Sequence, residues 1–381
     1  MNKRAIAILG AIFILIVGTL GFLIYSRSKK SSEPVANTNT ETPVVENPVT
    51  QDPVAEEPEV QAGGAVRLTD ASDPIVSPIL FFQGNGISYF NTQGHLFQTD
   101  LSLTGDTALL SNKRELSITL KSGISKILWP SAGNNFIAEF NSNTKPSWSF
   151  YNSLSASYVD IPAQVYSLDW MPTGDKIVFV WIDANGSATL NIGNPDTSGY
   201  QMLTDLYEPD NVISVAPNGK NILFYRTQTA DNTKNTINMV SIDGKTFSSI
   251  VKDGYNSGVL WSPDSQKFLF TKRDSGTQKF GLWMADVSTG EIKNLGVYTS
   301  VTKAVWSKDG QTVYAGVPTT GNAGQGLTQD TIYKITVATA QSQQFPTNVA
   351  VDAQNLFLSS DESTLFFKNA QDNALYYILV Q

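Results

Sequence analysis

Cysteine, histidine and serine are the residues that most often serve as nucleophiles and bases, so their numbers limit the covalent chemistry open to this chain. The chain has no cysteine and one histidine, His95, in the segment Thr92-Gln-Gly-His-Leu. It contains no Gly-x-Ser-x-Gly motif, so a Ser-His-Asp hydrolase site has no support in the sequence. We interpret His95 as a surface turn residue and predict a protein that is not an enzyme, with no catalytic residue.

Metal and cofactor sites are equally poorly supported. Thiolate ligands are absent, only one imidazole is available, and no Asp-x-Asp/Asn-x-Asp/Asn-Gly calcium loop occurs. We therefore predict no metal and no cofactor. One catalytic alternative stays open, because two acids that meet only in the folded chain leave no trace in the sequence: a carboxylate-based hydrolase or lyase.

Composition indicates the fold class and excludes one class of partner. The chain carries 26 Lys and Arg against 34 Asp and Glu, a net charge of −8. Binding of nucleic acid requires a basic face that neutralises phosphates, so we predict no nucleic-acid partner. Aromatic residues make up 10% of the chain and charged residues only 16%, which together with 28 glycines favours an all-β protein.

The N-terminal part of the chain predicts a membrane anchor. Residues 5–25 are an uncharged apolar run, and at about 1.5 Å per residue a helix of this length crosses a bilayer core. We expect an uncleaved signal anchor at the cell membrane, with residues 1–4 as a short cytoplasmic tail and the remainder extracytoplasmic. A cleaved signal peptide is the alternative. The basic flanks nearly balance, so the N-inside orientation rests on the spacer that follows.

Residues 26–65 are predicted to be a disordered linker rich in Pro, Glu and Thr. Prolines recur every five residues at positions 43, 48, 53 and 58, and residues 31–65 hold seven acids and no base. Such a segment cannot bury a core, and its prolines and like charges keep it extended. We interpret it as an inert linker, with a stalk that holds the following domain off the membrane as the alternative.

From residue 66 onward the chain repeats one unit: an apolar run ending in Trp, a Pro/Asp/Gly turn, and a second apolar run. The clearest copy, residues 261–270, reads Trp-Ser-Pro-Asp-Ser-Gln-Lys-Phe-Leu-Phe. Proline sets φ for the turn, and Gly or Asn tolerates the positive φ that a tight strand reversal needs. The Trp is expected to pack against the neighbouring unit. The repeat positions are Trp129, Trp170, Pro217, Trp261, Pro263, Asp264, Trp306, Asp309 and Gly310.

The spacing of these copies predicts a β-propeller. The lead residues lie at 129, 170, 215, 261, 306 and 358, with spacings of 41, 45, 46, 45 and 52 residues. A period near 45 with four short strands per unit is typical of propeller blades. The Trp-Ser-Pro-Asp-Gly/Ser unit resembles the TolB-type repeat, a WD-repeat-like family, and the propeller domains of prolyl-oligopeptidase-type peptidases. This resemblance implies a propeller over residues 66–381 and, by analogy with TolB, a protein partner.

Seven blades are favoured, with six as the alternative. Residues 77–111 read as one further four-stranded unit, and the final unit supplies only three strands. Residues 65–69 resemble the outer strands of other units. We therefore expect the first strand of the domain to complete the last blade and close the ring.

Loop residues are the candidates for recognition. Tyr207, Tyr255 and Tyr298 each precede the first strand of a unit, so they are expected on one face of the ring, where exposed Tyr often anchors a partner. Partial burial between blades is the alternative. Residues 316–331 form the longest predicted loop, interpreted as a tolerated insertion or a mobile flap.

These features predict a membrane-anchored, extracytoplasmic propeller that binds or scaffolds a protein or peptide partner in the cell envelope. Two alternatives remain. One is binding of a cell-wall glycan, or carboxylate chemistry on such a substrate in the propeller channel. The other is a structural assembly factor without a small ligand.

Overall fold

The computed structural model describes residues 64–381, except 82–83, 106, 117–120, 132–133, 141–145, 227–234, 255–257, 275–276, 278 and 322–325. The chain divides into two units, Met1–Val60 and Gln61–Gln381. The predicted cytoplasmic tail (1–4), membrane helix (5–25) and nearly all of the linker (26–65) lie outside the described residues. Within the described part, no helix combines the length and apolarity needed to cross a membrane.

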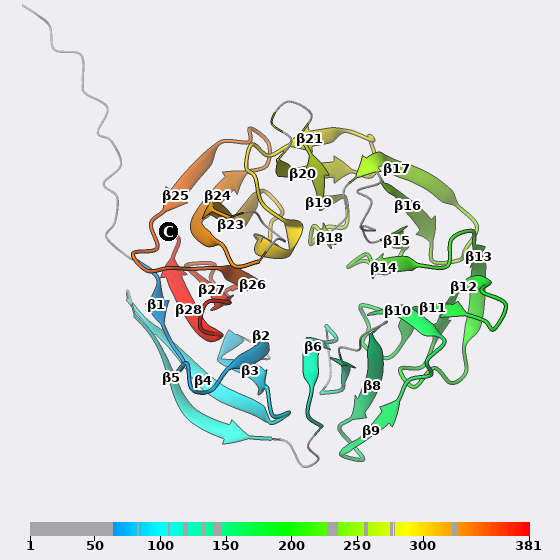
Figure 1. The fold of residues 1–381 in the computed structure, drawn as a ribbon, viewed down its shortest axis with the longest axis horizontal. Coiled ribbons are helices and arrows are strands. Elements are labelled where there is room, and N and C mark those ends of the chain that lie inside the picture. Colours follow the sequence, from blue (N-terminus) through cyan, green and yellow to red (C-terminus); the bar gives the residue numbers. More distant parts are fainter. Residues whose placement is uncertain are drawn as a thin grey trace, which may run out of the picture. The chain divides into compact units, whose positions relative to one another are not determined.

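The second unit is a seven-bladed β-propeller, as the seven-blade interpretation predicted. Its strands form seven antiparallel sheets of four strands each. Figure 1 shows these sheets arranged around a common centre, and the labelled strands nearest that centre are β2, β6, β10, β14, β18 and β26. The alternative of six blades is therefore wrong.

Blades 1 to 3 each consist of four consecutive strands. Their bounds are β2 (Ile75–Phe81), β3 (Gly86–Asn91), β4 (Leu96–Thr104) and β5 (Thr107–Glu115) in blade 1; β6 (Ile124–Leu128), β7 (Phe136–Phe140), β8 (Ser147–Asn152) and β9 (Ser157–Asp160) in blade 2; and β10 (Val165–Trp170), β11 (Ile177–Ile182), β12 (Ala188–Gly193) and β13 (Gln201–Leu206) in blade 3.

Blades 4 to 6 follow the same plan, and blade 7 combines both ends of the unit. The bounds are β14 (Asn211–Val215), β15 (Asn221–Arg226), β16 (Asn235–Ser241) and β17 (Phe247–Gly254) in blade 4; β18 (Val259–Trp261), β19 (Lys267–Arg273), β20 (Phe280–Asp286) and β21 (Ile292–Asn294) in blade 5; β22 (Ala304–Trp306), β23 (Thr312–Thr320), β24 (Gln329–Thr336) and β25 (Ser342–Phe345), preceded by the 3-10 turn η2 (Val301–Lys303), in blade 6; and β26 (Ala353–Leu358), β27 (Thr364–Asn369), β28 (Ala374–Leu379) and β1 (Val66–Arg67) in blade 7.

Ring closure occurs where the sequence predicted it. Strand β1 pairs antiparallel with β28, with Val66 opposite Tyr377. The pairing extends beyond the two strand residues, because Leu68 N donates to Leu375 O at 2.8 Å and Leu375 N donates to Thr69 Oγ1 at 2.9 Å. The last blade is thus completed by the start of the domain.

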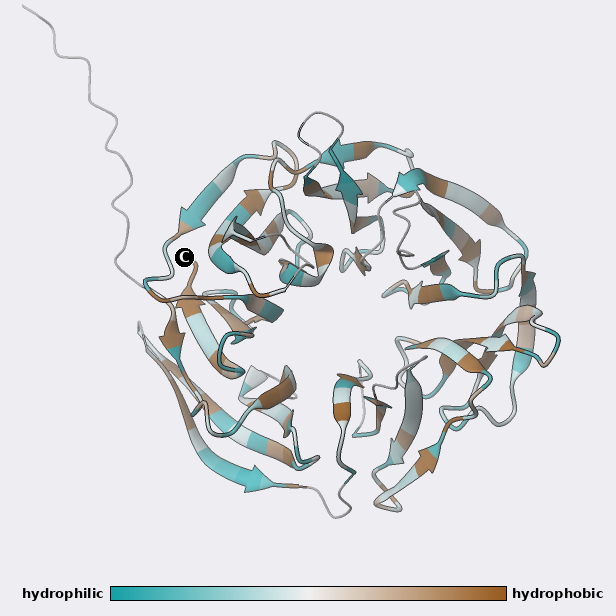
Figure 2. Cartoon of the chain, viewed as in Figure 1, coloured by the Kyte–Doolittle hydropathy of each residue, from teal (hydrophilic) through white to brown (hydrophobic). Residues whose placement is uncertain are grey.

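The core lies between blades rather than at the centre. The described residues form seven hydrophobic clusters, and each cluster joins two neighbouring blades. A strand buried on both faces explains runs without polar alternation, such as Ile-Val-Phe-Val-Trp-Ile in β11. The outer strands are polar instead: hydrophilic residues predominate on β5 and β25 (Figure 2), whose side chains are mostly exposed.

The four repeat tryptophans lie at these interfaces. Each indole Nε1 donates to a backbone carbonyl of the preceding blade, so the aromatic side chain both fills the interface and fixes its register. The bonds run from Trp129 to Ser77 O and from Trp170 to Leu128 O, both at 2.9 Å, from Trp261 to Ser214 O at 3.2 Å, and from Trp306 to Leu260 O at 3.1 Å.

The turns after Trp170, Trp261 and Trp306 have the predicted backbone. The fourth residue after the lead position has positive φ, with 73° at Gly174, 66° at Gly310 and 61° at Ser265. In the blade 5 copy, Ser262 Oγ donates to Asp264 Oδ1 at 2.6 Å, and this hydrogen bond within the turn stabilises it.

Candidate functional site

A cavity of about 420 Å³ lies on the side of blades 2 to 5 that faces the centre of the ring. First strands of four successive blades line it, and these strands lie nearest the centre in Figure 1. One lining residue from each strand is Lys126 of β6, Leu168 of β10, Val212 of β14 and Val259 of β18. The cavity therefore belongs to the central channel.

One row of side chains crosses blade 2 and reaches this cavity. Lys126 on β6 lies opposite Glu139 on β7, and Glu139 lies opposite Trp148 on β8. Residues directly opposite each other on neighbouring strands point to the same face of the sheet. The ammonium, the carboxylate and the indole therefore share one face, with the lysine exposed, the glutamate half-buried and the tryptophan buried.

The polar atoms of this row have no partners among the described residues. Neither the Lys126 ammonium nor the Glu139 carboxylate makes a hydrogen bond or an ion pair there. Trp148 Nε1 is also unpartnered, although the residue is only 8% exposed. A buried N–H without an acceptor is costly and rare in folded proteins. The row thus places one cation, one anion and one buried donor along the cavity, and none of the three has a partner in the described part of the chain.

Asp169 adds a second carboxyl group from blade 3. Its oxygens accept from Trp170 N at 2.9 Å and from Val215 N of blade 4 at 2.8 Å. The residue keeps some exposed surface, but its carboxyl group is enclosed between β10 and β14, and this burial raises the pKa of Asp169 to about 6. The two backbone donors and the charge of Lys126 limit that rise.

The electrostatics of the cavity follow from these groups. Burial also raises the pKa of Glu139, and the charge of Lys126 again opposes the rise. When both acids are ionised, the cavity holds two negative charges and one positive charge. A cation fits near the carboxylates, and a carbonyl or carboxylate fits near Lys126 and Trp148. Within the described residues, no group of three or more His, Cys, Asp or Glu side chains could hold a metal ion.

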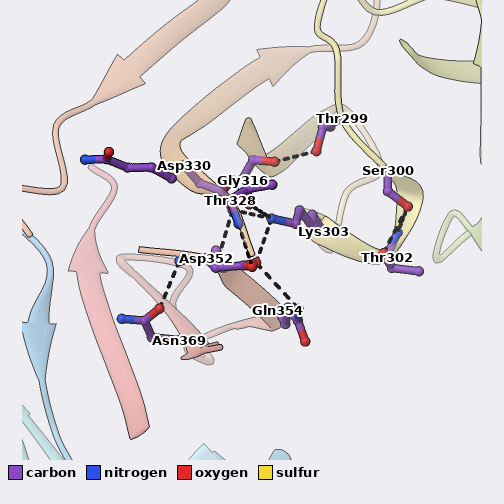
Figure 3. Close-up of polar contacts among 12 residues, drawn as sticks. Thr299, Ser300, Thr302, Lys303, Gly316, Thr328, Asp330, Asp352, Gln354 and Asn369 are labelled. Carbon is purple, nitrogen blue, oxygen red and sulfur yellow. Dashed lines mark hydrogen bonds and ion pairs between the residues drawn. The ribbon is translucent and has the colours of Figure 1, made fainter. Parts of the chain in front are cut away.

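A second ionic cluster, the sealed cluster, lies between blades 6 and 7; Figure 3 shows its contacts, and its charged side chains are buried. Lys303, at the end of η2, is 4% exposed, and Asp330 and Asp352 are each 1% exposed. Lys303 Nζ donates to Asp330 Oδ2 and Asp352 Oδ1, both at 2.7 Å, and to Thr328 Oγ1 at 2.5 Å. Asp330 Oδ2 also accepts from Ala353 N at 2.8 Å. Every charge in this cluster is paired, so we interpret it as a structural link between the two blades.

The structure describes two of the three predicted recognition residues. Tyr207 is 99% exposed in the connection between β13 and β14. Tyr298 is half-buried, with Lys279 Nζ 5.5 Å from its ring centroid, and Tyr255 lies outside the described residues. No hydrogen bond or ring contact joins the two described tyrosines. Neither of them lines the channel cavity.

Two further sequence assignments are placed by the fold. His95 Nδ1 lies 2.6 Å from Glu115 Oε1, and its ring stacks on Phe97, so it sits in a polar surface contact. The predicted loop 316–331 is wrong in its bounds. Residues 316–320 belong to β23 and 329–331 to β24, because the two strands keep pairing as far as Thr320 opposite Gln329.

The sequence interpretation did not single out the charged residues of the channel cavity or of the sealed cluster. A signal for them was present. The first strands of the blades are otherwise almost free of charge, and Lys126, Asp169 and Lys303 interrupt or immediately precede these apolar runs. Both lysines stand three residues before a repeat tryptophan.

Comparison with known proteins supports the fold and nothing finer. No family model matches the chain, and no curated protein matches its sequence. Among solved structures, an oligogalacturonate lyase in complex with manganese matches with a TM-score of 0.58 and 11% identity, over 83% of this chain and 93% of the other. The β-propeller domain of Cps50 (Swd1) from Myceliophteria thermophila matches with a TM-score of 0.58 and 10% identity, over 84% and 100%.

TolB from Acinetobacter baumannii overlays less well, with a TM-score of 0.42 and 13% identity over 78% of this chain and 79% of the other. At such identities, the two better matches establish that this chain shares the propeller fold with proteins of different activities.

Proposed function

We propose that this chain is a membrane-anchored, extracytoplasmic binding propeller that takes a segment of a protein or peptide partner into its channel cavity. Residues 5–25 supply the anchor and residues 26–65 the linker, so that the propeller stands in the cell envelope. The observation that carries the proposal is the row of Lys126, Glu139 and Trp148, which line the cavity and whose polar atoms have no partner among the residues that the structure describes.

The chemistry of the row suits a peptide carrying a basic group. A peptide backbone offers carbonyls that accept from Trp148 Nε1 and from Lys126. A Lys or Arg side chain, or an N-terminal amine, offers a cation for Glu139 with Asp169 nearby. Apolar lining residues such as Leu128 and Ile213 bury the remaining surface of the segment. A pocket that combines apolar walls with a few placed polar groups is typical of ligand sites.

The proposal is tested by measuring peptide binding to the full chain in detergent. Hexapeptides with one Arg or Lys among small neutral residues are titrated by calorimetry against wild type, Lys126→Ala and Glu139→Gln. Loss of a charge-assisted hydrogen bond should weaken binding by about tenfold or more. The control is Lys245→Ala, whose side chain is 81% exposed in the turn between β16 and β17 and which should bind as wild type does. Equal affinities for all four proteins would refute the assignment of this cavity.

A second candidate function rests on one specific observation. Glu139 and Asp169 line a single cavity, and burial raises the pKa of both, a pattern that also occurs in carboxylate-based hydrolases and lyases. We favour binding, because both oxygens of Asp169 already accept backbone N–H groups. Incubation with chitin and oligogalacturonate oligosaccharides, followed by chromatography, decides the matter: product formation by wild type but not by Glu139→Gln would establish the enzyme.

A further inference from the structure

A larger cavity, of about 720 Å³, lies at the interface of blades 1 and 2. Among the described residues, it shares no lining residue with the channel cavity. Trp129 and Tyr151 of blade 2 form one wall, and the end of β2, including Ile79, forms another. Its volume is in the range of small-molecule sites in proteins, roughly 300–1,000 Å³.

Part of the cavity has a visible cause in the sequence. The second strands of blades 5, 6 and 7 present large residues to the following blade: Leu269, Tyr314 and Phe366. On the corresponding face, β3 of blade 1 presents Phe90 and the much smaller Ser88, which lines the cavity. The small side chain leaves unfilled the volume that a core residue occupies elsewhere in the ring.

One buried amide inside this cavity has a donor without an acceptor. Gln98 of β4 lies opposite Ser88 on the same face and is only 6% exposed. Its Oε1 accepts from Arg114 Nη2 at 3.2 Å, and because an arginine can only donate, this contact fixes which end of the amide is oxygen. The other end, Nε2, has no partner among the described residues. A buried donor of this kind is costly unless something accepts its hydrogen bond.

We propose that this cavity binds a compact, uncharged and largely apolar molecule that carries a carbonyl or similar acceptor, placed to receive a hydrogen bond from Gln98 Nε2. The absence of charge follows from the lining, since none of the described residues around the cavity is acidic or basic. Aromatic groups of the ligand pack against Trp129 and Tyr151. This site is independent of the peptide cavity and of the function proposed for it.

The test uses two probes of the same shape, 2-acetylnaphthalene, which carries a carbonyl, and 2-ethylnaphthalene, which does not. Binding to the full chain is measured by titration of the thermal shift in one detergent buffer. The same micelles are present for every variant, so partition of the probe cancels between variants. We expect Gln98→Met to weaken the acetyl probe by about tenfold and to leave the ethyl probe unchanged.

Two further variants make the result specific. Ser88→Phe, or Ser88→Leu if the first does not fold, fills the part of the cavity beside Gln98 and should weaken binding of both probes. Arg114→Ala removes the partner of Gln98 Oε1, which comes from the exposed outer strand β5, and should preserve the preference for the acetyl probe. Failure of either probe to bind wild type, equal loss of both probes in Gln98→Met, or unchanged binding in the cavity-filling variant would each overturn the proposal.

Discussion

Two lysines occupy the same position of the repeat and have opposite surroundings. Lys126 and Lys303 each stand three residues before a repeat tryptophan, and each has two acids in its neighbourhood. Lys126 is exposed in the channel and makes no ion pair among the described residues. Lys303 is 4% exposed and binds both of its acids at 2.7 Å. The repeat position therefore fixes where the backbone places each lysine. The neighbouring side chains determine whether the charge of that lysine is paired.

The residue facing each lysine explains the difference. Glu139 lies opposite Lys126 on β7. Lys303 immediately precedes Ala304, which pairs with Ala315, so the next position on the facing strand is Gly316. A Cβ on Gly316 would lie 3.0 Å from Asp330 Oδ2 and from the Ala353 side chain. Only a residue without a side chain leaves the space in which acids from β24 and the start of blade 7 close around the lysine.

The largest expected effect breaks the sealed cluster. Lys303→Met leaves two buried carboxylates without their cation, and the free energy of unfolding should fall by about 3–5 kcal/mol. The matched change in the channel, Lys126→Met, removes an exposed and unpaired charge and should stay within about 0.5 kcal/mol of wild type. Urea denaturation followed by fluorescence measures both. Similar losses in the two variants would show that the lysines do not differ as described.

The channel acids should make stability depend on pH. Asp169 has a folded pKa of about 6, above its ordinary value of 3.8, so the folded state binds more protons than the unfolded state between these values. The contribution of Asp169 to the free energy of unfolding is therefore fully present below pH 3.8 and is lost as the pH rises through 6. Asp169→Asn should reduce the difference in unfolding free energy between pH 4 and pH 7 by on the order of 2 kcal/mol.

This comparison between two pH values removes any constant effect of the lost carboxylate oxygen on the bonds to Trp170 and Val215. Glu139 acts in the same direction, because burial also raises its pKa, so some pH dependence should remain in the variant. If the difference in unfolding free energy between pH 4 and pH 7 is the same in wild type and in Asp169→Asn, the carboxyl group of Asp169 is not enclosed.

A smaller effect sharpens the role of the glycine. Gly316→Ala places a methyl group in close contact with Ala353 and Asp330 and should destabilise the propeller by about 1–3 kcal/mol. At the equivalent channel position, Glu139→Ala creates no such contact and should cost less than about 1 kcal/mol. Thermal unfolding of the two variants side by side gives the answer, and a tolerated alanine at position 316 would argue against the steric explanation.

Much of the architecture could be predicted because it is repeated. Six copies of one turn gave the period, and the likeness of residues 65–69 to other outer strands gave the closure, which the pairing of Val66 with Tyr377 confirms. The candidate sites could not be predicted in the same way. Tyr207, Tyr255 and Tyr298 share a sequence context, and the two that the structure describes, Tyr207 and Tyr298, do not line the channel cavity. Glu139 and Asp169, 30 residues apart and in different blades, line one cavity.

By itself, the sequence determined the period, the turns and the packing role of the tryptophans, because these are local patterns that each blade must satisfy to cover its faces. Only the tertiary structure decided which polar groups are satisfied. Lys126 and Lys303 are the same residue at the same repeat position, and Gln98 and Trp148 carry no distinguishing motif. Whether a polar group is paired depends on side chains that the neighbouring strand and blade contribute. The linear pattern of residues does not contain the distances between these side chains.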